Sequence, residues 1–282
     1  MDKTKEIITI AFVFAFFVAA GGFTYFYGVK SHDLHYIRLE VNPKVEFITS
    51  DDNKVLTVYP VNDHAKMLLT DEEFIGLDIK EACEKFFDLC VRTNYIDIDG
   101  EDNTVRITVV SGFMQALEMQ VYESINNYLI KNEILTMIVE NDNDRTEVTH
   151  AKEENVSSPN KLALIKTIMM QAPDKYEFKE LNALNENKLL VKIKKLHEKG
   201  YQPNNHKAEE RIKKAQLLNT YKEKVTAHKA NITNESSRAF HEKFDDFKLV
   251  NKNLYERDFD ELYNKNFPDE KDDDEVLENQ EN

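Results

Sequence analysis

The dipeptide Asn42-Pro43, within the stretch RLEVNPKVEF at residues 38–47, combines residue types that could break a peptide bond. In most Asn-X pairs the backbone N–H of residue X attacks the Asn side chain and causes deamidation. Pro43 has no N–H, so that route is closed. The remaining route is attack by the side-chain amide of Asn42 on its own backbone carbonyl, which forms a cyclic imide and releases Pro43 as a new N-terminus.

Such an attack is slow at an ordinary peptide bond, because resonance stabilises the planar amide. A twist of about 12° stores roughly 1 kcal/mol and weakens that resonance. A tight turn locked between two paired strands can supply such strain. The sequence therefore predicts cleavage only if the fold holds Asn42-Pro43 in a turn of this kind.

Glu40 is the candidate proton acceptor for this reaction. It precedes Asn42 by two positions, which would place both side chains on the same face of a strand. A structural interpretation stands beside the chemical one: Pro43 would simply interrupt the hydrogen-bond ladder and introduce a bend between two edge strands. The residues alone leave both interpretations open.

Alternating apolar residues predict a sheet around this dipeptide, and helical spacing predicts helices after it. A capping box is expected at Asp78, with Glu81 three positions later. The predicted elements are strands within 36–49 and at 55–61, a short helix from Asn62 or Asp63 to Leu69, a helix after Asp78, a strand at 104–112, a helix at 113–132 and a strand at 134–140. This order predicts an α+β domain over 30–141, with a small, mostly antiparallel sheet and two helices on one face.

The N-terminal segment predicts a membrane anchor. Residues 7–29 carry no charge, and as a helix they would rise about 35 Å, enough to cross a hydrocarbon core of roughly 30 Å. We expect a single-pass transmembrane helix, with residues 1–6 as a cytoplasmic stub and the bulk of the chain extracytoplasmic. The stretch FVAAGG leaves a cleaved signal peptide as the alternative.

The C-terminal half is expected to be helical and strongly charged. Residues 142–158 are polar and aperiodic, which is typical of a linker. We expect a helical extension over 159–200 and a charged helical region over 201–267. The acidic tail, 268–282, has too few apolar residues to fold alone.

The composition excludes several functional classes. The net charge of −15 argues against general binding to nucleic acids, which are polyanions. Cys83 and Cys90 are seven positions apart in a predicted helix, too far for a disulfide, and are expected on its buried face. The histidines have no nucleophile or metal-ligand spacing beside them. We therefore expect no metal, no cofactor and no multiple-turnover enzyme activity.

Two stretches carry a family resemblance. YIRLEVNPKVEFITSDDNKVLTVYPVNDHAKMLL followed by GLDIKEACEKFFDLC, and later SSPNKLALIKTIMMQ, resemble the extracytoplasmic middle domain of membrane-bound anti-sigma-I factors. The resemblance implies a single-pass bacterial membrane protein whose outer domain cleaves itself between Asn42 and Pro43 and keeps both fragments paired through the sheet. Where the family tends to have Ser, Asp and Ser around the Asn-Pro pair, this chain has Arg38, Glu40 and Lys44.

The functional expectation is a membrane-anchored regulatory or sensor module of the anti-sigma-I factor type. Only about six residues precede the predicted anchor in this sequence, so we do not expect it to bind a sigma factor itself. The alternative is a membrane-tethered binding or scaffold protein that is never cleaved. Its C-terminal helices would then engage a protein or cell-wall partner.

Overall fold

The computed structural model describes residues 34–111, 115–140, 145–203 and 205–252. The predicted anchor at 7–29 and the acidic tail at 268–282 lie outside these ranges. Within the described ranges, no helix combines the length and the apolar character that a membrane crossing requires.

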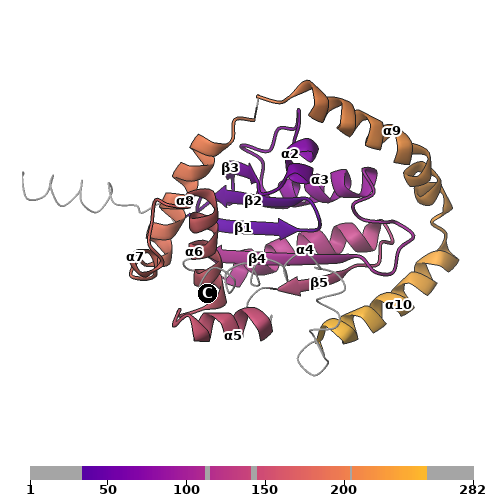
Figure 1. The fold of residues 1–282 in the computed structure, drawn as a ribbon. Coiled ribbons are helices and arrows are strands. Elements are labelled where there is room, and N and C mark those ends of the chain that lie inside the picture. The colour runs from indigo at the N-terminus through magenta and orange to yellow at the C-terminus, as the bar shows by residue number, and fades with distance from the viewer. Residues whose placement is uncertain (1–33, 112–114, 141–144, 204, 253–282) are drawn as a thin grey trace, which may run out of the picture. The chain divides into compact units, whose positions relative to one another are not determined.

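A five-stranded mixed sheet lies at the centre of this part of the chain (Figure 1). Its strands are β1 (His35–Glu40), β2 (Lys44–Thr49), β3 (Val55–Pro60), β4 (Thr104–Ser111) and β5 (Met137–Glu140). The strand order is β3-β2-β1-β4-β5, and only the β4–β5 pair is parallel. Helix α4 (Gln115–Lys131) connects these two strands, and a parallel pair requires such a crossover. The sheet is thus mostly antiparallel, as predicted, with one parallel edge.

One face of the sheet packs on three helices: α2 (Asp63–Leu68), α3 (Ile79–Arg92) and α4. Alternation along β1 places Ile37 and Leu39 on this face, where both are fully buried. The capping box that starts α3 is present as predicted, with reciprocal hydrogen bonds between Asp78 and Glu81. Cys83 and Cys90 of α3 are buried free thiols in the same core, also as predicted.

The opposite face is covered as well, so the prediction of helices on only one face was wrong. Helices α6 (Pro159–Gln171) and α8 (Glu186–Gly200) pack there, joined by α7 (Phe178–Asn182). Tyr36, Ile48 and Val110 supply the apolar contact from the sheet. These side chains alternate with the first set along their strands, so both faces of the sheet contribute buried apolar residues. Helix α5 (Arg145–Glu153) lies within 142–158, where a linker was expected.

A buried polar cluster joins this second helical layer to the sheet. Glu46 of β2 is fully buried and accepts hydrogen bonds from the Tyr36 hydroxyl (2.8 Å) and from Gln171 Nε2 (2.8 Å). Its carboxylate also lies 2.9 Å from Nε2 of His197 on α8 and 3.2 Å from the Thr167 hydroxyl on α6. One carboxylate therefore links β2 to both α6 and α8.

The charge of Glu46 is stabilised by its neighbours. Burial alone would raise its pKa, but the hydrogen bond and charge of His197, together with the charge of Arg38, hold that pKa below its usual value. The carboxylate is therefore ionised at neutral pH despite its burial.

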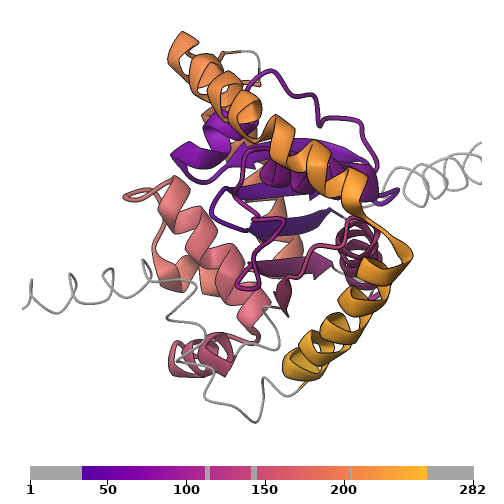
Figure 2. The same cartoon turned by 90° about the vertical axis from the view of Figure 1, so that its right-hand side faces the viewer.

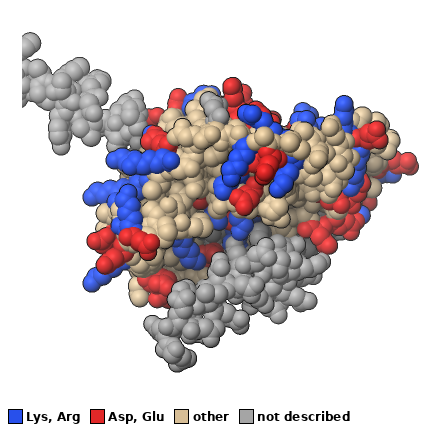
Figure 3. All heavy atoms as spheres, turned by 45° about the horizontal axis from the view of Figure 1, so that its top comes forward, with Lys and Arg blue, Asp and Glu red and all other residues tan. Residues whose placement is uncertain are grey.

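The charged C-terminal region forms two further helices, α9 (Ala208–Asn231) and α10 (Asn234–Lys252). Both views show α9 lying over the α2 and α3 side of the domain and α10 continuing toward β5 (Figures 1 and 2). Phe240 and Phe244 pack on Leu135. On the face shown in Figure 3, basic side chains are interspersed with acidic ones.

Replacing Glu46 by Gln should destabilise the protein at neutral pH and much less in acid. The folded-state pKa of Glu46 lies below the unfolded value of about 4.3. Its contribution is therefore fully present above the unfolded value and is lost as pH falls through the folded one. Disrupting a buried charged pair costs roughly 3–5 kcal/mol. Urea unfolding at pH 7 and at stepwise lower pH measures the difference in free energy of unfolding.

Glu73→Gln is the matched control, because Glu73 is exposed. We expect it to change the free energy of unfolding by less than about 0.5 kcal/mol at every pH. A Glu46→Gln effect that did not shrink in acid would contradict a role for the ionised carboxylate.

Candidate self-cleavage site

Asn42 and Pro43 lie in the short connection between β1 and β2. The Val41 N–H donates a hydrogen bond to the Pro43 carbonyl (3.2 Å), which closes the turn next to the Glu40–Lys44 pair. Asn42 is exposed and Pro43 is buried. The turn is therefore as predicted, but β1 and β2 are interior strands of the sheet and not the edge strands of the structural interpretation. Pro43 is tolerated because it lies outside the ladder.

Asn62 contacts this turn from the end of β3. Its side-chain Nδ2 donates to the Asn42 carbonyl oxygen at 2.5 Å. Its Oδ1 accepts the backbone N–H groups of Lys44 (3.2 Å) and Ala65 (3.0 Å). Since two N–H donors converge on Oδ1, the amide group of Asn62 is oriented with Nδ2 toward Asn42. One side chain thus spans Pro43, with contacts to Asn42 before it and to Lys44 after it.

Two local features place Asn62 there. The Val61 N–H bonds to the Lys44 carbonyl (2.9 Å), which continues the β2–β3 pairing to the turn. Asn62 is also the N-cap of α2, and its contact with the Ala65 N–H is the capping bond. The sequence predicted that Asn62 or Asp63 would cap this helix, but did not predict contact with Asn42.

The contact between Asn62 and Asn42 is chemically significant because of the oxygen that receives it. Attack on the Asn42 carbonyl carbon would convert this oxygen into an oxyanion. A fixed N–H donor aimed at such an oxygen stabilises the developing negative charge. The arrangement therefore suits the predicted cleavage reaction.

Glu40 lies at the end of β1 and is 3% exposed. Its carboxylate is 2.8 Å from Arg38 Nη2 and 3.5 Å from Lys44 Nζ. Burial would raise its pKa, but the charges of Arg38, Arg106 and Lys44 together hold that pKa below its usual value. Glu40 is therefore ionised, as a proton acceptor must be, although a lowered pKa makes it a weak base.

Arg38 and Lys44, which stand where the anti-sigma-I family tends to have Ser, thus form ion pairs around Glu40. Arg38 also lies 4.0 Å from the buried carboxylate of Glu46. Within the described ranges, no cluster of three or more His, Cys, Asp or Glu side chains is arranged to hold a metal ion.

Comparison with known proteins places these residues in a family. Residues 34–167, which run from β1 into α6 and include Asn42, Pro43 and Asn62, match the family model described as the anti-sigma factor RsgI-like central domain.

A curated relative agrees with this match. The chain is 24% identical over 167 residues to a protein of Acetivibrio thermocellus named anti-sigma-I factor RsgI7. The alignment covers 56% of this chain and 30% of that relative, so the chain spans less than a third of the relative's length. Residues 34–167 of this chain form an anti-sigma factor RsgI-like central domain.

Proposed function

We propose that this chain is a membrane-anchored regulator of the anti-sigma-I factor type whose domain cleaves its own backbone between Asn42 and Pro43. The family of the central domain supports a regulatory role. The observation that carries the cleavage proposal is the hydrogen bond from Asn62 Nδ2 to the Asn42 carbonyl oxygen.

The reaction proceeds in two steps. Asn42 Nδ2 attacks the Asn42 carbonyl carbon and loses one proton, for which Glu40 is the proposed acceptor. The carbonyl oxygen becomes negatively charged, and the Asn62 amide donates to it. The bond to Pro43 then breaks, its nitrogen takes up a proton, and the upstream fragment ends in a cyclic imide that water opens.

The two fragments would remain paired after cleavage. The upstream fragment, residues 1–42, retains β1, which forms antiparallel ladders with β2 on one side and β4 on the other. Ile37 and Leu39 also stay buried in the core. Separation would require the loss of both ladders and of this burial, so load or proteolysis would be needed to release the downstream fragment.

The predicted anchor makes this arrangement useful for signalling. Residues 7–29 lie in the same upstream fragment as β1, with the N-terminus inside the cell in the predicted orientation. Release of residues 43–282 would leave a short membrane-bound stub. Short stubs of this kind are what intramembrane proteolysis requires.

Mass spectrometry of the full chain tests the proposal. We expect one fragment that begins at Pro43 and another that ends at Asn42. While the imide persists, the fragment that ends at Asn42 has a mass one water molecule below that of the same fragment with a free C-terminal carboxylate. Asn42→Ala should abolish both fragments because it removes the attacking nitrogen. Asn127→Ala, at an exposed position of α4, is the control and should cleave normally. Wild-type chain that stays intact after long incubation would exclude self-cleavage and favour the uncleaved tethered protein.

Asn62→Asp isolates the contribution of the Nδ2 donor. Aspartate caps helices as well as asparagine does, and it still accepts the N–H groups of Lys44 and Ala65. It has no N–H for the Asn42 carbonyl. The loss of one oxyanion donor slows related reactions by about 10²–10³-fold, and we expect a decrease of that order in the cleavage rate.

Thermal unfolding of the same variant provides the control, because a stability close to that of the wild type would show that α2 is intact. A second variant, Asn62→Ser, also keeps a favoured cap residue but is too short to span Pro43, and should be equally slow. Cleavage of Asn62→Asp at the wild-type rate would rule out a role for this donor.

A further inference from the structure

We infer that Lys214 of α9 is a positioning residue for the Asn42–Pro43 bond and acts on it through α2 and Asn62. The inference rests on the proposed self-cleavage and concerns the regulation of that site. Helix α9 lies outside the matched residues 34–167, so the effect would be a property of this chain's own C-terminal region.

Lys214 forms a buried contact at the C-terminal end of α2. Its side chain is almost fully buried, and Nζ lies 2.6 Å from the Thr70 carbonyl oxygen and 2.7 Å from Glu72 Oε1. A buried ammonium group is tolerated only with such partners. Next to it, Arg211 forms a bidentate ion pair with the Asp71 carboxylate, with hydrogen bonds of 2.9 and 3.0 Å. Helix α9 is thus fixed to the segment 70–72.

Helix α2 depends on its packing against the sheet and on what holds its two ends. It has six residues and rises only about 9 Å, far below the length at which an isolated helix is stable. Asn62 holds its N-terminal end and contacts the Asn42 turn. At the other end the Thr70 hydroxyl donates to the Lys66 carbonyl (2.9 Å), and Lys214 binds the Thr70 carbonyl. Release of Lys214 would therefore loosen the helix that carries Asn62.

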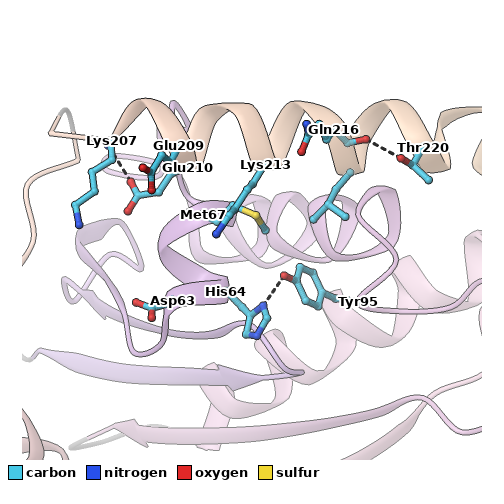
Figure 4. Close-up of a pocket in the computed structure, with 11 residues that line it drawn as sticks. Asp63, His64, Met67, Tyr95, Lys207, Glu209, Glu210, Lys213, Gln216 and Thr220 are labelled. Atoms are coloured by element: carbon cyan, nitrogen blue, oxygen red, sulfur yellow. Dashed lines mark hydrogen bonds between the residues drawn. The ribbon is translucent and has the colours of Figure 1, made fainter.

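An open cavity separates α9 from much of the outer side of α2 (Figure 4). Its volume is about 530 Å³, and it is lined by His64 and Met67 from α2, by Tyr95, and by residues of α9 that include Lys213 and Leu217. His64 Nδ1 is hydrogen bonded to the Tyr95 hydroxyl at 2.7 Å. The side chains of Arg211 and Lys214 bind the segment just after α2, at residues 70–72, and so link α9 to the end of that helix.

Lys214→Met removes the ammonium group and keeps most of the apolar stem. Glu72 is not left without a charged partner, because Lys85 of α3 lies 2.9 Å from its Oε2. Lys222→Met is the matched control on an exposed position of α9. Lys214→Arg tests for rescue by a side chain that keeps the charge.

The first experiment uses the full chain with Asn42→Ala, in which no cleavage is possible and the residue 42 carbonyl is still present. Hydrogen–deuterium exchange is followed over residues 61–68. Loss of a hydrogen bond to a charged group should speed exchange there by about tenfold in Lys214→Met, with no change in Lys222→Met. Unchanged exchange in Lys214→Met would overturn the inference, whether or not the native bond is cleaved.

The second experiment measures cleavage in chains that carry Asn42. Lys214→Met should slow cleavage by about tenfold, and Lys214→Arg should restore part of the rate. In an Asn62→Asp chain, Lys214→Met should add little further slowing, because the contact that it positions is already lost. Equal slowing in both backgrounds would show a general structural effect and overturn the inference.

The two experiments separate two kinds of failure. An intact wild-type chain would refute the proposed self-cleavage, while the exchange measurement would still decide whether Lys214 controls α2.

Discussion

The structure depends on the position of β1 between β2 and β4. This strand supplies hydrogen bonds to both neighbours, and its alternating side chains supply apolar contacts to both faces of the sheet. It is also the first described element, and its chain continues directly into the Asn42-Pro43 turn. Cleavage of the chain just after β1 would leave the hydrogen-bond ladders on both sides of this strand in place, because the turn contributes no ladder hydrogen bond of its own.

Local patterns in the sequence were enough to predict much of this fold. The Asn-Pro turn, the capping box at Asp78 and the buried cysteines depend on residues close in sequence, and all are present. The second helical layer was not predicted, because the apolar positions of Tyr36 and Ile48 were not recognised as a second buried face. The parallel β4–β5 pair was missed because strand direction depends on how α4 crosses the sheet.

At the candidate site, too, the sequence predicted residues that are close together in the chain but not contacts between residues that are far apart in it. Asn42, Pro43 and Glu40 were found because they are near neighbours in the chain. Asn62 was recognised only as a helix cap. Its contact with Asn42 spans twenty positions and follows from the register of β2 against β3. No single-sequence pattern specifies that register, so this contact of Asn62 was missed. The ion pairs around Glu40 were missed for the same reason, since they join three strands.

Asn62 both caps α2 and contacts the Asn42 carbonyl, and this double role has a consequence for timing. The side chain can reach the turn only after β2 has paired with β3 and α2 has formed. An unfolded or newly synthesised chain lacks this contact, so under the proposed reaction its Asn42-Pro43 bond would behave as an ordinary peptide bond. Cleavage at this bond would then occur only in chains that have folded, and a misfolded chain would stay uncleaved.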